Sequence, residues 1–120
     1  MSTFDNAVSI NPYFRIRAED MEACKGFLAR FCKLVSAEEN CLFYNFTLMG
    51  DVVCCREAYR DAAAVVAHLE NCGAALGEFM GIAELLRIEV HGPAGELDKL
   101  KPAFAAFNPE YYVSECGIGN

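Results

Sequence analysis

The sequence predicts an α+β fold of the ferredoxin-like type, in which helices cover one face of an antiparallel sheet. Segments with the alternating pattern of strands and segments with the three-to-four spacing of helices follow one another as β-α-β-β-α-β, and one more helix and strand follow. Hydrophobic residues make up 54 % of the 120 residues, so a large apolar surface must be buried. We therefore expect a single domain over residues 1–120, with a polar N-terminal segment at residues 1–10.

The first strand and the first helix are expected at residues 12–18 and 19–36. In the strand, Phe14 and Ile16 point to one side and their neighbours to the other, which is the pattern of a half-buried strand. In the helix, apolar residues recur at steps of three and four, and acidic residues crowd the first turn, where they suit the helix dipole.

A β-hairpin is expected next, with strands at residues 41–48 and 52–59 and a turn at Gly50 and Asp51. Its first strand carries large apolar side chains on both faces, so both faces need a cover. These faces hold Leu42, Tyr44, Phe46 and Leu48 on one side, and Cys41, Phe43, Asn45 and Thr47 on the other. Helices can cover one face, and a second copy of the sheet is the simplest cover for the other. We therefore expect a homodimer through the sheet face; the alternative is that the C-terminal helix folds over it.

The second half of the chain alternates in the same way. Asp61 is a good N-cap, so a helix is expected at residues 62–72 with Gly73 at its end. The remaining elements are a helix at 74–85, a strand at 86–91, a helix at 96–107 that Pro102 kinks or splits, and a strand at 110–116.

Charge and motifs exclude several classes of function. The net charge is −7 and the lysines and arginines are scattered, so neither nucleic acid nor a membrane surface is an expected partner. No apolar run reaches the roughly 18 residues of a membrane helix, and the start lacks a basic segment followed by an apolar one. The seven cysteines are odd in number and include no C-x-x-C pair, which favours buried thiols and a cytoplasmic location.

Cofactor and metal sites are not expected either. The sequence has no Gly-x-Gly-x-x-Gly, no phosphate-binding loop and no Gly-x-Ser-x-Gly motif. Glu89 and His91 share one strand face and could form half of a metal site, but no second pair stands at ligand spacing. We therefore expect a protein that binds neither a cofactor nor a metal ion.

An acid, a phenol and an imidazole are expected at one corner, where the hairpin leads into the following helix. Glu57 and Tyr59 lie two residues apart on one strand face, and His68 borders the apolar stripe of the helix. His68 is a candidate general base or a hydrogen-bond donor to a ligand oxygen, and Tyr59 is a candidate donor beside it. The other interpretation is structural: a boundary histidine tied to a carboxylate, and a buried network that orients the helix, with Arg15 or Arg17 as partner of the acid.

Five further residues are candidate ligand contacts. Asn45 is unusual in a strand, which indicates either a ligand contact or a β-bulge or cross-strand hydrogen bond. Arg15 is a candidate for binding an anionic group, or an exposed arginine on an edge strand. Tyr44, Phe79 and Met80 are candidates for lining an apolar pocket, and core packing is the alternative for each.

Two stretches of the sequence resemble a known family. They are Glu39-Asn40-Cys41-Leu42-x-Tyr44 and Glu57-x-Tyr59-x-Asp61-x-x-Ala64-x-x-x-His68-Leu69. This pattern, over about residues 13–71, resembles the antibiotic biosynthesis monooxygenase-like proteins of the dimeric α/β-barrel superfamily. Members that oxidise aromatic polyketides without a cofactor commonly use an Asn–Trp pair, and relatives that open haem add a histidine. Asn45 and His68 would stand at two of these positions, whereas this chain has no tryptophan. Other relatives isomerise or degrade small carbonyl compounds.

Together, residues and resemblance favour a small enzyme that acts on an apolar or aromatic carbonyl compound without a cofactor. The chemistry would be that of a monooxygenase or an isomerase, with His68 as base and Tyr59 or Asn45 holding the oxygen. The alternative is a non-catalytic homodimer that binds a small molecule or serves as a scaffold. In such a protein His68, Tyr59 and Glu57 would be satisfied by one another and closed to solvent, whereas in an enzyme at least one would face a cavity.

Overall fold

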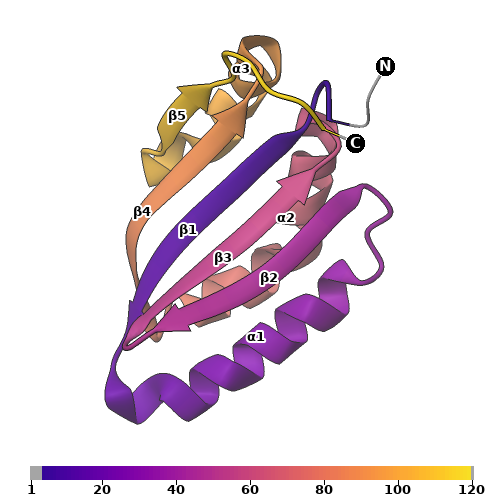
Figure 1. Ribbon diagram of the computed structural model, residues 1–120. Coiled ribbons are helices and arrows are strands. Elements are labelled where there is room, and N and C mark those ends of the chain that lie inside the picture. Colours follow the sequence, from indigo (N-terminus) through magenta and orange to yellow (C-terminus); the bar gives the residue numbers. More distant parts are fainter. Residues whose placement is uncertain (1–3, 120) are drawn as a thin grey trace.

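The computed structural model describes residues 4–119. Its strands form one sheet in the order β2-β3-β1-β4-β5, and Figure 1 shows α2 behind this sheet. The elements are β1 (Val8–Ile16), α1 (Met21–Val35), β2 (Cys41–Met49), β3 (Val52–Tyr59), α2 (Ala62–Phe79), β4 (Ala83–Gly92), α3 (Ala94–Phe104) and β5 (Glu110–Val113). The predicted ferredoxin-like α+β class is confirmed. The sheet of the single chain is open and not closed into a barrel.

The last strand departs from the antiparallel sheet that the sequence predicts. β5 pairs with β4 in parallel, with Glu89 opposite Glu110. The reason is the intervening α3, which carries the chain back along the sheet so that the next strand runs in the same direction. Within α3, Pro102 lies in the last turn and does not split the helix, and a 3-10 turn (Ala105–Phe107) follows.

β1 begins before its predicted start at residue 12, so the segment expected to be polar contains its first three residues. Val8 and Ile10 are buried on the helical face, and Val8 is paired with Tyr59 of β3. Ser9 and Asn11 alternate with them on the other face. This alternation is the sequence pattern of a strand, which the predicted boundary at residue 12 overlooked, and the pairing with β3 and β4 shows the strand directly.

α2 is one continuous helix, where the sequence predicts two pieces separated at Gly73. It begins as expected, because the Asp61 carboxylate accepts a hydrogen bond from the backbone N–H of Ala64 at 2.9 Å. The helix runs through Gly73 because its buried stripe continues in Ala75 and Phe79. Packing of that stripe outweighs the roughly 1 kcal/mol that glycine costs inside a helix.

Two buried apolar clusters fill the space between the sheet and the helices. The first lies where α3 meets β4 and α2, and it includes Val8, Tyr59, Val65, Val90, Leu97 and Leu100. The second lies under α1 and the second half of α2, where the ring of Phe79 is 5.1–5.6 Å from those of Phe14, Phe27 and Phe31. The site described below lies between these clusters.

No element among residues 4–119 covers the opposite face of the sheet. α3 packs on the helical side, through Leu97, Leu100 and Phe104, so the alternative in which it folds over the open face is not realised. On the open face, Phe43 of β2 stands opposite Ala58 of β3 and is 46 % exposed. All seven cysteines are free thiols. Among the described residues, no helix is both long and apolar enough to cross a membrane.

Candidate functional site

The site lies where β3, α2 and the loop before β2 meet. The alternation of β3 turns Glu57 and Tyr59 toward the helices, and both are buried. α2 begins at Ala62, soon after β3 ends, and runs back over the strand, which brings His68 above the two residues. Glu38 reaches the same point from the loop that follows α1.

Four polar side chains form one chain of contacts at this point. The Nδ1 atom of His68 lies 2.9 and 3.2 Å from the two carboxylate oxygens of Glu38, and its Nε2 atom lies 3.5 Å from Oε1 of Glu57. That same Oε1 atom accepts a hydrogen bond of 2.6 Å from the Tyr59 hydroxyl. The side chains of Glu38, His68 and Glu57 are only 12, 8 and 6 % exposed. Each histidine nitrogen therefore faces a carboxyl group in a nearly dry environment.

Burial controls the electrostatics of the cluster. It raises the pKa of the Glu57 carboxyl, and His68 and the Tyr59 hydroxyl oppose this shift without cancelling it. Burial and the neighbouring Glu57 together raise the pKa of Tyr59. Burial also raises the pKa of Cys72 to about 12, which keeps it a thiol at neutral pH. The environment thus favours the neutral forms of these three groups.

Glu38 and Asn71 are members of the site that sequence reasoning missed. The Asn71 amide donates hydrogen bonds to Oε2 of Glu38 at 2.8 Å and to the carbonyl of Leu34 at 3.0 Å, which fixes the loop and its carboxylate against α2. Glu38 stands in an irregular segment 30 residues from His68, so no periodicity points to it. Cys72 was also missed, although its i, i+4 spacing from His68 is a visible signal.

An apolar cavity of about 80 Å³ adjoins the cluster. His68, Glu57 and Tyr44 form its polar part. Its apolar part includes Phe14, Phe31, Phe46, Leu76, Phe79 and Met80. The ring of Tyr44 is 5.5 Å from that of His68, so the imidazole lies between the rings of Tyr44 and Tyr59. Tyr44, Phe79 and Met80 therefore lie where the sequence analysis expected pocket residues.

Two of the candidate residues lie elsewhere. Asn45 is exposed on the open face of the sheet and stands opposite Arg56 of β3, whereas its neighbour Tyr44 points to the helices. Arg15 is exposed as well, and its Nε atom lies 3.5 Å from a carboxylate oxygen of Asp51 in the hairpin turn. The structure does not bring either side chain to the cavity.

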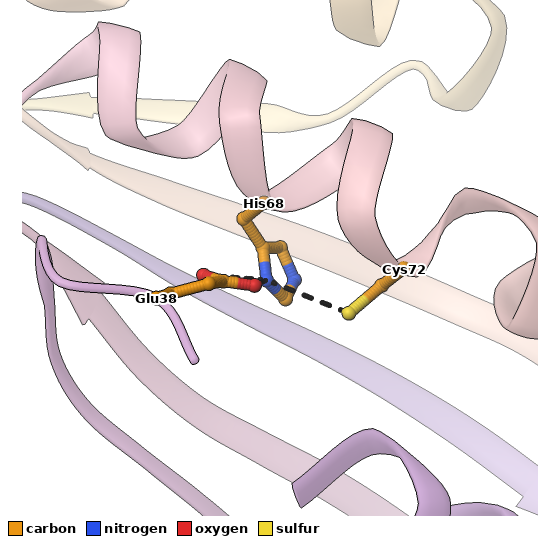
Figure 2. A group of neighbouring side chains, drawn as sticks. All are labelled: Glu38, His68 and Cys72. Atoms are coloured by element: carbon orange, nitrogen blue, oxygen red, sulfur yellow. Dashed lines mark hydrogen bonds and ion pairs between the residues drawn. The ribbon is translucent and has the colours of Figure 1, made fainter. Parts of the chain in front are cut away.

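One group of side chains has the composition of a metal site. Figure 2 shows Glu38 and Cys72 on either side of His68, and one ligand atom from each lies within 4.8 Å of the others. The pair that the sequence analysis considered is engaged differently: His91 stacks on Tyr112 with ring centroids 4.6 Å apart, and Glu89 accepts a hydrogen bond from Tyr13.

No family model and no curated protein matches the chain. Among solved structures, MupZ from Pseudomonas fluorescens is 36 % identical, with 96 % of this chain and 95 % of MupZ covered and a TM-score of 0.91.

Two more distant structures share the fold. A candidate antibiotic biosynthesis monooxygenase from Chloroflexus aurantiacus is 15 % identical, with 95 % of this chain and 100 % of that chain covered and a TM-score of 0.62. A conserved protein of unknown function from Bacteroides thetaiotaomicron is 19 % identical, with 72 % and 96 % covered and a TM-score of 0.66. The chain belongs to the antibiotic biosynthesis monooxygenase-like family of the dimeric α/β-barrel superfamily.

Proposed function

We propose that this chain is a small enzyme that removes a proton beside the carbonyl group of an apolar or aromatic substrate, with His68 as the base. The observation that carries the proposal is an imidazole held between two carboxyl groups at the edge of an otherwise apolar cavity. The carbanion formed in this way is the common starting point of isomerisation and of cofactor-independent oxygenation. The proposal therefore requires no organic cofactor.

Glu38 and His68 have complementary roles in this scheme. Glu38 holds Nδ1 of the imidazole at 2.9 Å, which fixes the ring and stabilises the imidazolium that forms when a proton is accepted. The contact from Nε2 to Glu57 is 3.5 Å, longer than a good hydrogen bond. Nε2 is thus the nitrogen for which a substrate carbon acid can compete.

Glu57 supplies the oxygen-binding group. Burial raises its pKa, which favours the neutral acid, and a neutral carboxylic acid can donate a hydrogen bond to a developing enolate oxygen. The Tyr59 hydroxyl donates its hydrogen bond to Glu57, and Tyr59 does not line the cavity. We therefore assign Tyr59 the role of positioning Glu57.

Deuterium exchange tests the proposal without knowledge of the natural substrate. The wild-type protein is incubated in D₂O with a panel of aromatic and aliphatic 1,3-dicarbonyl compounds, and exchange at the carbon between the carbonyls is followed by NMR. We expect His68→Ala to slow this exchange about 100-fold or more. His91→Ala, on a histidine stacked against Tyr112, is the matched control and should exchange at the wild-type rate.

Exchange at the wild-type rate in a folded His68→Ala protein would remove His68 from the mechanism. An oxygen electrode separates the two reaction types, because oxygenation consumes O₂ and isomerisation does not.

A second candidate function is that of a non-catalytic binding protein or scaffold of the same fold. It is favoured by the mutual contacts of His68, Glu57 and Tyr59, and by the lack of any unsatisfied buried polar side-chain atom among the described residues. Under this alternative, a compound of the panel would bind with no exchange above the solvent rate, and His68→Ala would change only its affinity.

The proposal includes a homodimer through the open face of the sheet. It is supported by the absence of a cover for this face among the described residues and by the exposed Phe43 on β2. The cavity lies on the helical side, so each chain carries its own site.

A further inference from the structure

We propose that Glu38, His68 and Cys72 form a binding site for one divalent transition-metal ion, and that zinc is the ion that suits this site best. Figure 2 shows the three side chains converging from α2 and from the loop before β2. The site shares His68 and Glu38 with the proton-transfer site proposed above, and His68 would not serve as the base while it binds the ion. Metal binding can be tested without a substrate.

The two distances from His68 to the other ligands are close to those of a tetrahedral site. With Zn–N and Zn–S bonds of about 2.0–2.3 Å, bound nitrogen and sulfur atoms lie about 3.6 Å apart, and bound nitrogen and oxygen atoms about 3.3 Å apart. In the structure, Nδ1 of His68 lies 3.8 Å from Sγ of Cys72 and 2.9 Å from Oε2 of Glu38. The third pair, a Glu38 carboxylate oxygen and Sγ of Cys72, lies within 4.8 Å, against about 3.5 Å around a bound zinc, so these two side chains would approach each other by up to about 1 Å to admit the ion.

The chemistry of the donors selects the metal. One imidazole nitrogen, one thiolate and one carboxylate form a set of intermediate softness, which suits zinc and related ions rather than magnesium or calcium. His68 and Cys72 are one helical turn apart on α2, so the helix itself holds two ligands at a fixed separation. Coordination displaces the thiol proton of Cys72 to solvent.

Outer contacts also match those of a metal site. A metal-bound histidine usually directs its other nitrogen to a carboxyl group, and Nε2 of His68 faces Glu57 at 3.5 Å. The Asn71 amide holds Oε2 of Glu38 at 2.8 Å. His68 and Cys72 also line the cavity, so a water molecule or a cavity ligand can occupy the fourth position of the ion.

The charge of the cluster calls for a cation. Glu38 is nearly buried, and within residues 4–119 it has no lysine or arginine at ion-pair distance. Its one basic neighbour among these residues is His68. A buried carboxylate without a permanent cation is costly, and a bound divalent ion would compensate it.

Cobalt(II) provides the test, because a bound thiolate gives a charge-transfer absorption band that nitrogen and oxygen ligands do not. Chelator-treated, reduced protein is titrated with Co²⁺, and Zn²⁺ is then added as competitor. We expect one Co²⁺ per chain, a thiolate band, and displacement by one Zn²⁺. In Cys72→Ser the band should disappear. In Glu38→Gln the band should remain, with at least 10-fold weaker binding.

Exposed cysteine thiols that bind Co²⁺ outside the proposed site would give a false positive. Cys32 is exposed on α1 and serves as the matched control, so Cys32→Ser should bind Co²⁺ as the wild-type protein does. The proposal is overturned if the wild-type protein gives no thiolate band, or if the band persists in Cys72→Ser. It is equally overturned if Cys32→Ser removes the band. Circular dichroism of each variant verifies its fold, and Glu38→Gln keeps the test decisive if Cys72→Ser does not fold.

Discussion

Two tyrosine–glutamate pairs lie on opposite faces of the same sheet. On the helical face, Tyr59 donates a hydrogen bond to Glu57 at 2.6 Å. On the open face, Tyr13 of β1 donates one to Glu89 of β4 at 3.0 Å. The two pairs use the same chemical groups and differ in the third residue that each carboxylate meets.

That third residue is Arg87 on the open face and His68 on the helical face. An arginine keeps its charge at every accessible pH, so it holds Glu89 in a fixed ion pair. An imidazole can both accept and donate a proton, so the pair on the helical face can exchange protons with a ligand. A tyrosine–glutamate pair thus becomes a candidate site when its third partner can accept a proton and a cavity adjoins it.

The largest difference between the two pairs should appear when each glutamate is removed. We expect Glu57→Ala to lower the free energy of unfolding by about 3 kcal/mol, because Tyr59 and His68 lose a partner where water cannot replace it. Glu89→Ala should cost less than about 1 kcal/mol, since Arg87 is half exposed and also lies 3.5 Å from Glu110. Urea denaturation measures both, and equal losses would contradict the comparison.

Removing each hydroxyl is a milder form of the same test. Tyr59→Phe should lower the free energy of unfolding by about 1–2 kcal/mol, because it leaves a buried carboxyl group without its donor. Tyr13→Phe should cost about 0.5 kcal/mol or less, because Glu89 keeps its arginine. A double-mutant cycle on Tyr59 and Glu57 should give a coupling energy that the cycle on Tyr13 and Glu89 lacks.

The proposed dimer would change the environment of the pair on the open face. Phe43→Asp should raise the dimer dissociation constant about 10-fold, equivalent to about 1.4 kcal/mol, because it places a charge in the interface. Val66→Asp, at an exposed apolar position on α2, is the control and should leave association unchanged. Sedimentation equilibrium measures both variants. A wild-type protein that stays monomeric at all concentrations would refute the dimer.

The smallest effect is expected at a fully exposed ion pair. Arg30 of α1 lies 2.9 Å from Glu78 of α2 and lowers the pKa of that carboxyl. A lowered pKa gives stabilisation that is present above the ordinary pKa of glutamate and is lost as the pH falls below it. Solvent screens this pair, so Arg30→Ala should not shift the urea midpoint measurably at neutral pH. A clear shift in the urea midpoint would show that this exposed ion pair contributes to stability as a buried pair such as His68–Glu38 does.

Local signals in the sequence were sufficient for most of the fold. The turn at Gly50 and Asp51 and the N-cap at Asp61 were predicted because each depends on a few adjacent residues. The continuity of α2 through Gly73 was not predicted, because the packing of the stripe on both sides overrides the glycine. The parallel direction of β5 likewise depends on where α3 docks.

The candidate site was predictable only in part, for the same reason. Glu57, Tyr59 and His68 belong to one strand–helix unit, so their meeting follows from the alternation of β3 and the start of α2. Asn45 was assigned from its residue type in a strand and from the family resemblance, and Arg15 from its residue type alone. The pleat of the sheet turns both away from the cavity.

The sequence by itself therefore determined the ferredoxin-like class, the hairpin and the three residues that one local unit brings together. Tertiary structure decided the rest: that Glu38, 30 residues away, closes on His68, that Cys72 joins them, and that one face of the sheet stays open. Patterns of hydrophobicity report which side of an element is buried. They do not report which loop will reach that side, because loop placement depends on contacts between residues that are distant in the chain.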